Sequence, residues 1–364
     1  MIEILAGDCR ETLKNLADQS INTCITSPPY WGLRDYGTAE WEGGDENCDH
    51  VEPSSSIKFK GRDDQAHTKK QYKKQCPKCG AIRKDKQLGM EDMPEEFVEN
   101  LVQVFREVKR VLRDDGTVWL NLGDSYANTP TGNIGNSKKQ KTNIRSHKNF
   151  KRNGTFRLPH KNLIGIPWRV AFALQQDGWY LRQDIIWHKP NPMPESVTDR
   201  CTKAHEYIFL LSKQAKYYYD HEAIREDCEG IDERQWAEEY EAVGSVLQGE
   251  SNAEIKRTKR YNKDGSFKRN KRSVWTVTTK PYKEAHFATF PMDLIKPCVL
   301  AGCPEGGTVL DPFGGSGTTG QIADGHNRNA ILCELNPEYI EISKKRLGVG
   351  TDLFSEVEIK NERK

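Results

Sequence analysis

The sequence predicts an α/β fold built on a doubly wound, mostly parallel β-sheet. Its 364 residues are enough for one catalytic domain with sizeable insertions. Short apolar runs alternate with segments of helical periodicity along most of the chain, and the part from residue 308 onward follows a strict strand–helix–strand–helix order. Alternation of this kind is typical of a parallel sheet covered by helices on both faces.

The individual elements follow from periodicity and turn residues. Strands are expected at residues 1–5, 21–26, 117–122, 180–187, 206–211, 216–219, 308–311 and 329–333, and helices at residues 11–16, 94–112, 167–176, 316–324 and 337–347. The strands 206–211 and 216–219 are close enough to form a hairpin. The helix 94–112 has the clearest apolar stripe, and Asp114-Asp115-Gly116 is expected to end it.

Two polar segments without a sustained period interrupt this pattern, near residues 37–89 and 220–272. We interpret them as insertions into one catalytic domain. The predicted organisation is a catalytic half at residues 1–36 and 90–219, a metal-binding insertion at 37–89, a target-recognition region at 220–275, a cofactor-binding half at 276–350 and a tail at 351–364.

A glycine-rich turn, DPFGGSGTT at residues 311–319, joins a predicted strand to a predicted helix. Glycines let the backbone approach a ligand, and a helix start favours a carboxylate or phosphate. The spacing is not the G-x-G-x-x-G of a dinucleotide site, and no lysine precedes the threonine as in a P-loop. The next strand leads to Glu334, an acid suited to accept both ribose hydroxyls of a nucleoside cofactor.

A second motif, TSPPY at residues 26–30, ends the strand 21–26. Two consecutive prolines cannot continue a β-ladder, so the chain must turn there. Ser27 Oγ and the Pro28 carbonyl can then point into a cleft as hydrogen-bond acceptors, while Tyr30 offers a ring for stacking. Two acceptors suit an exocyclic amine, because they hold its hydrogens and expose the nitrogen lone pair to an electrophilic methyl group.

Together, TSPPY and DPFGGSGTT resemble the amino-methyltransferases of DNA, which act on cytosine N4 or adenine N6. The catalytic motif precedes the cofactor motif by roughly 280 residues, and this order resembles the circularly permuted β group of that family. The resemblance covers most of the chain outside the two polar segments. It implies a Rossmann-like fold, S-adenosylmethionine as the methyl donor and double-stranded DNA as the substrate, with the target base flipped out of the duplex.

The resemblance also implies roles for individual residues. Ser27, Pro28, Pro29 and Tyr30 would hold and stack the target base. The residues expected at the S-adenosylmethionine pocket are Asp8, which would contact the adenine, Phe290, which would close over the methionine part, Asp311, Phe313, Gly315 and Glu334. Serine before Pro-Pro-Tyr is typical of members that act on cytosine, so cytosine N4 is favoured over adenine N6.

Four metal-ligating side chains flank the first polar segment. Cys76 and Cys79 form a C-x₂-C knuckle followed by glycine, and Cys48 with His50 could complete a tetrahedral set. A polar segment of this length has little else to fold around. We therefore expect a structural zinc ion that organises a small ribbon-like module without taking part in catalysis, the alternative being an insertion with idle thiols.

Charge is balanced overall, with a net charge of +2 from 55 basic and 53 acidic residues, but basic runs stand at residues 138–152 and 256–272. These runs fit a polyanionic partner, although such runs are often solvated surface. Scattered cysteines, no signal-peptide pattern and no long apolar stretch indicate a cytoplasmic protein without a membrane partner. A cognate restriction endonuclease is a further expected partner, while the oligomeric state stays open.

Two alternatives belong to other functional classes. One is a methyltransferase for RNA or for a protein amide, which the permuted motif order argues against. The other is a non-catalytic zinc-containing DNA-binding protein, which the two intact motifs argue against.

Overall fold

The computed structural model describes residues 1–32, 36–50, 75–127, 158–227, 268–279 and 290–348, together with the backbone of residues 357–361. Its centre is a nine-stranded sheet with the strand order β10-β6-β7-β5-β2-β11-β12-β1-β13. The strands of this sheet are β1 (Ile2–Ala6), β2 (Ile21–Thr26), β5 (Leu112–Leu122), β6 (Tyr180–His188), β7 (His205–Ser212), β10 (Val274–Thr276), β11 (Thr308–Asp311), β12 (Asn329–Glu334) and β13 (Val357–Asn361). In the described part of the sheet only β7 runs antiparallel to its neighbours. The predicted doubly wound, mostly parallel sheet is therefore confirmed.

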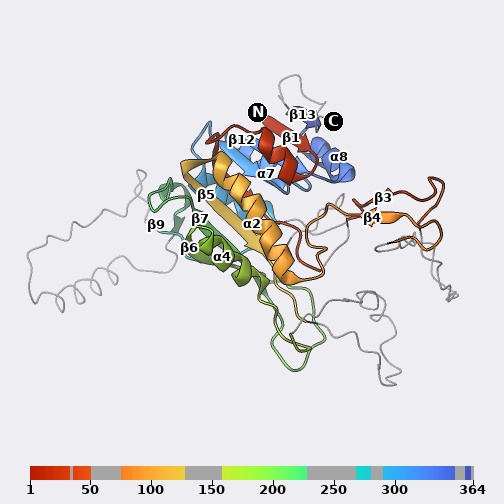
Figure 1. Ribbon diagram of the computed structural model, residues 1–364. Helices are drawn as coiled ribbons and strands as arrows, with labels where there is room; N and C mark the ends of the chain where they lie inside the picture. The colour runs from red at the N-terminus through yellow and green to blue at the C-terminus, as the bar shows by residue number, and fades with distance from the viewer. Residues whose placement is uncertain are drawn as a thin grey trace, which may run out of the picture.

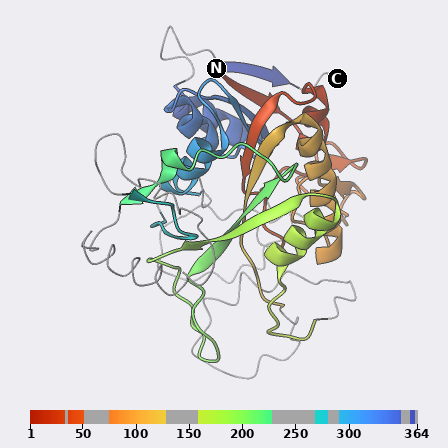
Figure 2. The same ribbon diagram turned by 90° about the vertical axis from the view of Figure 1, so that its left-hand side faces the viewer.

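Helices cover both faces of the sheet. The helices are α1 (Cys9–Thr12), α2 (Pro94–Val111), α4 (Ile166–Gln176), α6 (Met292–Gly302), α7 (Thr318–Asp324) and α8 (Pro337–Arg346), with short 3₁₀ turns at Leu13–Asn15 and Glu222–Ile224. Figure 2 shows α2 and α4, in orange and green, on one side of the sheet and the blue C-terminal helices on the other. Period-2 alternation divides the core accordingly: Val118 and Leu120 of β5 pack with the first group of helices, whereas Trp119 packs with the second.

The hairpin predicted for residues 206–219 is wrong. The structure has a single strand there, β7, which pairs with β5 on one side and with β6 on the other. Because both edges of β7 are occupied, residues 216–219 have no ladder to join and lie outside any strand.

Two further elements differ from the sequence-based expectation. Asp114-Asp115-Gly116 does not end α2: the helix ends at Val111, and β5 begins at once because Leu112 is already extended (φ −73°, ψ 137°). Ile21 pairs with Leu112 but Thr23 pairs with Thr117, so the Asp-Asp-Gly segment forms an irregularity within the strand pairing. Residues 357–361, expected within a tail, form β13 and pair in parallel with β1.

The first polar segment contains a small antiparallel pair, β3 (Glu40–Glu42) with β4 (Ile82–Lys84). Figure 1 shows this pair projecting beside the sheet, at the opposite end from β9. In the second polar segment, β8 (Glu226–Asp227) pairs with β9 (Lys268–Arg269), and β10 adds to the sheet edge beside β6. The C-terminal ends of the parallel strands all open toward one edge of the main sheet, where the turns that follow them can form a site.

Candidate active site and metal site

A cavity of about 830 Å³ lies at this edge, lined by residues that directly follow β1, β2, β5, β11 and β12. Its size falls within the range of roughly 300–1,000 Å³ that is usual for small-molecule and cofactor sites. We call the part formed by Asp8, Phe290, Phe313, Gly315 and Glu334 the glycine-turn side, and the part formed by residues 27–30 with Asn121, Lys189 and Glu206 the Pro-Pro side.

Glu334 is the central acid of the glycine-turn side. Its Oε2 accepts a hydrogen bond of 2.7 Å from the Gly315 backbone N–H, and its Oε1 accepts one of 2.7 Å from the Asn336 N–H. Gly315 has a φ of +52°, a conformation that favours glycine and turns its N–H toward the acid. Burial raises the pKa of Glu334 to about 7. The two bonds fix the carboxylate at the cavity wall, as expected for a group that binds a ligand through hydroxyls.

Asp311 lies behind the wall of the cavity rather than on it. The side chain is buried and accepts hydrogen bonds of 2.6 Å from both the Thr26 and the Thr319 hydroxyls, and one of 3.1 Å from the Phe313 N–H. Burial raises its pKa to about 6. Asp311 therefore joins the residue before Ser27 to the helix after the glycine turn, and the sequence-based prediction of a pocket-lining residue does not describe its position.

Asp8 and Phe290 both line the cavity, as predicted. Asp8 also begins α1, where its Oδ1 accepts a hydrogen bond of 2.9 Å from the Arg10 N–H, and the Arg10 guanidinium lies 2.5 Å from its Oδ2. This ion pair holds the carboxylate at the start of the helix. Residues 280–289, directly before Phe290, lie outside the described residues.

Ser27, Pro28, Pro29 and Tyr30 all line the opposite part of the cavity. The Tyr30 hydroxyl lies 2.7 Å from Glu206 Oε2, to which it donates a hydrogen bond. Burial, together with the neighbouring Glu206, raises the pKa of Tyr30 well above its usual value, so the phenol stays protonated.

Gly123 explains how the Tyr30 ring fits beside β5. A Cβ atom at position 123 would come within 2.5 Å of Tyr30 Cε2, so any larger residue would displace the ring. Asn121, two residues earlier, has its Oδ1 3.1 Å from the Tyr30 hydroxyl and donates a bond of 3.0 Å to the Tyr207 carbonyl. The end of β5 thus contacts the Tyr30 ring at Gly123 and the Tyr30 hydroxyl at Asn121.

Sequence reasoning missed several residues of the Pro-Pro side. Asn121 lies near the end of an apolar strand. Its buried amide was the signal that could have identified it as a site residue. Lys189 forms an ion pair with Glu206, and both side chains are largely buried. Lys203 also lines the cavity, and burial lowers its pKa. Glu206 is also among them, because nothing local in the sequence shows that it reaches Tyr30.

The chain that leaves the first polar segment forms another part of the cavity wall, at residues 86–88. Gln87 Oε1 accepts a hydrogen bond of 2.7 Å from the Tyr36 N–H. The N–H of Gly32, two residues after Tyr30, donates a bond of 2.8 Å to the Gly89 carbonyl. The C-terminal end of the segment is therefore tied by hydrogen bonds to residues that follow the Pro-Pro motif.

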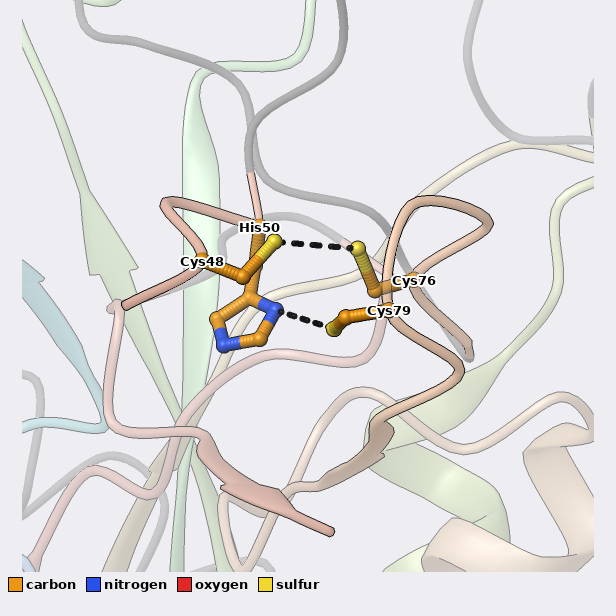
Figure 3. Close-up of side chains that lie close together, drawn as sticks. All are labelled: Cys48, His50, Cys76 and Cys79. Carbon is orange, nitrogen blue, oxygen red and sulfur yellow. Dashed lines mark hydrogen bonds between the residues drawn. The ribbon is translucent and has the colours of Figure 1, made fainter. Parts of the chain in front are cut away.

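The four predicted metal ligands come together in this segment. Their ligating atoms, from Cys48, His50, Cys76 and Cys79, all lie within 4.8 Å of one another, and Figure 3 shows the side chains pointing toward one another from two separate turns. Cys48 Sγ is 3.7 Å from Cys76 Sγ, and Cys79 Sγ is 3.5 Å from His50 Nδ1. The two halves of the predicted set thus form one cluster.

Neighbouring groups support this cluster. Trp41 of β3 stacks on the His50 ring with centroids 4.3 Å apart. Hydrogen bonds from the Asp45 and Ala81 backbones lower the pKa of the Cys79 thiol, which favours the thiolate form that metals bind. The arrangement therefore has both the ligands and the orienting contacts of a metal site.

Much of the predicted DNA-contacting sequence lies outside the described residues, including the basic run 138–152 and residues 256–267. Of the rest, Arg269 and Arg272 bind the same acid, Glu226, at 2.8 Å and 2.5 Å. Among the helices that the structure describes, none is long and apolar enough to cross a membrane.

Comparison with known proteins identifies relatives along nearly the whole chain. The family model for N6 and N4 DNA methylases matches residues 21–345. The type II methyltransferase M.Cfr9I of Citrobacter freundii is 40% identical over 94% of this chain and 87% of its own length. For M.SmaI of Serratia marcescens the identity is 40%, over 95% of this chain and 90% of the relative.

Solved structures agree in fold. A Thermus thermophilus protein described as a DNA modification methylase, complexed with S-adenosylmethionine, has a TM-score of 0.52 at 20% identity and covers 99% of this chain and 100% of its own. The PvuII DNA methyltransferase, described as cytosine-N4-specific, has a TM-score of 0.54 at 16% identity and covers 98% of this chain and 88% of its own. At such identities the likeness is one of fold.

Proposed function

Because the chain belongs to the N6/N4 DNA methylase family, we propose that it methylates the N4 amine of a cytosine flipped out of duplex DNA. The observation that carries the proposal is the position of Ser27-Pro28-Pro29-Tyr30 in one cavity with Glu334 and the glycine turn. One side of this cavity suits a nucleoside cofactor, and the other suits a planar base that carries an amine.

The glycine-turn side fits S-adenosylmethionine. Glu334 keeps carboxylate lone pairs for ribose hydroxyls beyond the two backbone bonds it accepts. Asp8 and Phe290, on the same side, are available to the adenine and to the methionine part. When bound, S-adenosylmethionine supplies an electrophilic methyl group, and the residues of this side orient it toward the Pro-Pro side.

The Pro-Pro side holds the amine and receives its proton. Ser27 Oγ and the Pro28 carbonyl accept the two amine hydrogens, so that the nitrogen lone pair points toward the methyl group. As the nitrogen–carbon bond forms and the carbon–sulfur bond breaks, the nitrogen becomes acidic and must lose one proton. The Tyr30 hydroxyl lines the same side of the cavity as Ser27 and donates to Glu206. We propose that the proton leaves the amine on this side and reaches the Glu206 carboxylate by way of the Tyr30 hydroxyl.

The choice of cytosine rests on Ser27, the residue before Pro-Pro-Tyr. The decisive experiment is transfer of labelled methyl from S-adenosylmethionine to duplex DNA, followed by nucleoside digestion and mass spectrometry. We expect N4-methylcytosine. N6-methyladenine would instead establish adenine as the target. Label found on RNA or protein alone, or DNA binding without transfer, would favour the two alternatives from other functional classes.

We also propose that Cys48, His50, Cys76 and Cys79 bind a structural zinc ion. In a tetrahedral site with zinc–sulfur bonds of about 2.3 Å and zinc–nitrogen bonds of about 2.0–2.1 Å, two sulfurs are about 3.8 Å apart and a sulfur and a nitrogen about 3.6 Å apart. The sulfur pair at 3.7 Å and the sulfur–nitrogen pair at 3.5 Å match these two edges. The geometry thus supports a closed four-ligand site.

Metal analysis of the native purified protein tests this site. One zinc per chain is expected, and Cys76→Ser should lose it and lower the melting temperature. Cys201→Ser is the matched control, because Cys201 is an exposed cysteine outside the cluster, and it should retain the metal. Native protein that contains no zinc and melts at the same temperature with and without a chelator would rule the site out.

The partners proposed from the sequence extend this function. Sequence readout is proposed for residues 220–275, with phosphate contacts from their basic side chains. A restriction endonuclease of the same specificity, and a cytoplasmic location where DNA and S-adenosylmethionine are both available, complete the proposal. Mapping the methylated positions on plasmid DNA would give the recognition sequence needed to search for such a partner.

A further inference from the structure

An exposed methionine stands at the mouth of the cavity on its Pro-Pro side. Met193 belongs to the connection between β6 and β7, which extends away from the sheet as a loop in Figure 2. Its side chain is 84% exposed, the highest value among the large hydrophobic side chains that the structure describes. Nevertheless, Met193 lines the same cavity as Ser27. A long apolar side chain kept in water beside a polar site contributes little packing to the free protein.

The loop presents Met193 from a constrained backbone. Pro192 and Pro194 flank it and restrict the chain to extended conformations. On one side, Asn191 Nδ2 donates a bond of 3.2 Å to the Thr279 carbonyl, and its Oδ1 accepts one of 3.0 Å from the Thr279 N–H. The side chain therefore stands at a defined place relative to β10 and the cavity.

The other end of the loop is fixed by an ion pair. Glu195 Oε2 lies 2.6 Å from Arg200 Nη1, and the Arg200 guanidinium also stacks over the Tyr126 ring at 4.0 Å. Lys189 and Lys203, from the same connection between β6 and β7, line the cavity beside Met193. Lys189 is already paired with Glu206, so the exposed end of the loop at the mouth is the apolar Met193 tip.

We propose that Met193 is a wedge that enters the DNA stack where the target base leaves it. This inference rests on the proposed function, because only base flipping opens such a gap. Methionine is among the apolar residues that proteins insert between base steps, and its unbranched thioether adapts to an irregular gap. The flanking prolines keep the tip ordered before binding, so that less conformational freedom is lost on insertion.

The test compares two DNA duplexes that carry the mapped methylation site. One is fully paired, and the other has an abasic position opposite the target base, so that the target has no partner to leave. In single-turnover methylation, Met193→Ala should slow transfer to the paired duplex about 10-fold or more, the effect of losing part of the flipping energy. Its rate on the abasic duplex should stay near that of the native enzyme. Met193→Leu, which keeps an apolar tip, should act like the native protein on both.

Fluorescence gives a second readout that does not depend on turnover. A 2-aminopurine next to the target base becomes brighter when its neighbour is flipped out, and Met193→Ala should reduce this increase on the paired duplex. Met292→Ala is the matched control, because Met292 is an exposed methionine at the start of α6 that does not line the cavity.

The outcomes separate the wedge from the proposed function. Unchanged transfer by Met193→Ala on the paired duplex, or equal slowing on both duplexes, would overturn the wedge, since neither depends on opening the stack. A native enzyme whose product on these duplexes is not N4-methylcytosine would overturn the proposed function itself.

Discussion

The two sides of the cavity differ in what holds their acidic side chains. On the glycine-turn side, Glu334 is held by the backbone N–H groups of Gly315 and Asn336, neither of which adds charge. On the Pro-Pro side, Glu206 is held by the Lys189 ammonium and the Tyr30 hydroxyl, both from other parts of the chain. The first acid is fixed by backbone amides, the second by side chains.

This difference has a chemical consequence. An acid fixed by backbone amides has no cation nearby, so burial dominates and its pKa rises. Glu206 accepts the Tyr30 hydroxyl beside Lys189 and can receive a proton that arrives through Tyr30. We therefore expect the glycine-turn side to govern cofactor affinity and its pH dependence, and the Pro-Pro side to govern turnover. Asp311, which binds both Thr26 and Thr319, is the contact between the two sides.

The largest effect is expected from removing the acceptor that holds the amine. Ser27→Ala should reduce kcat by about 10²–10³-fold, the loss typical of one preorganised hydrogen-bonding group in a transition state. The dissociation constant for S-adenosylmethionine, measured by calorimetry, should stay close to that of the native protein, because Ser27 lies on the Pro-Pro side. Ser20→Ala, which removes an exposed hydroxyl bonded to the Ala17 carbonyl, should change neither. Loss of cofactor binding in Ser27→Ala would contradict the division into two sides.

A smaller effect is expected from pH on the glycine-turn side. The pKa of Glu334 is raised to about 7, and ribose hydroxyls donate best to its ionised form. Cofactor binding should therefore weaken as pH falls through 7, with a dissociation constant about 10-fold higher at pH 6 than at pH 8. Calorimetric titrations across this range would measure it.

The control for this pH effect is Glu334→Gln, which should bind the cofactor more weakly but with a flat pH profile. The same pH slope in that variant would assign the titration to another group, and the comparison between the two sides would lose its electrostatic basis.

Sequence patterns predicted those parts of the site that are local in the chain. The glycine turn, the Pro-Pro turn and the acid at the end of β12 each lie within a few residues of a strand end. Hydrophobic periodicity and turn-forming residues were therefore enough to predict them. The four metal ligands were predicted for a similar reason, since cysteine and histidine at short spacing have few other uses. Their convergence is confirmed, while zinc itself stays a prediction.

The parts that were missed depend on contacts between distant segments. Tyr30 and Glu206 are 176 residues apart in sequence and meet only because β7 lies beside β5. The same strand order explains the wrong hairpin, since the sequence does not show that β6 occupies the second edge of β7. The motif around Asp311 predicts a ligand site, whereas its hydrogen bonds to Thr26 and Thr319 join the end of β2 to α7.

The subtlest test of the comparison concerns the ion pair of the Pro-Pro side. Glu206→Gln leaves an amide oxygen that can still accept from Tyr30 but removes both the proton acceptor and the charge opposite Lys189. We expect kcat to fall several-fold, less than the roughly 10²–10⁴-fold typical of a positioned proton acceptor, because the amide still holds Tyr30; cofactor affinity should stay unchanged. Lys189→Met alone leaves Glu206 charged in a largely buried position and should also lower stability.

Each single change leaves one charge without its partner. The loss in unfolding free energy of the double variant should therefore be smaller than the sum of the losses of the two single variants. We expect a coupling free energy on the order of 1 kcal/mol in denaturant unfolding. Additive effects on stability would mean that solvent already screens the pair, and Glu206 would then be held by Tyr30 rather than by Lys189. A change of cofactor affinity in Glu206→Gln would show instead that the two sides are not independent.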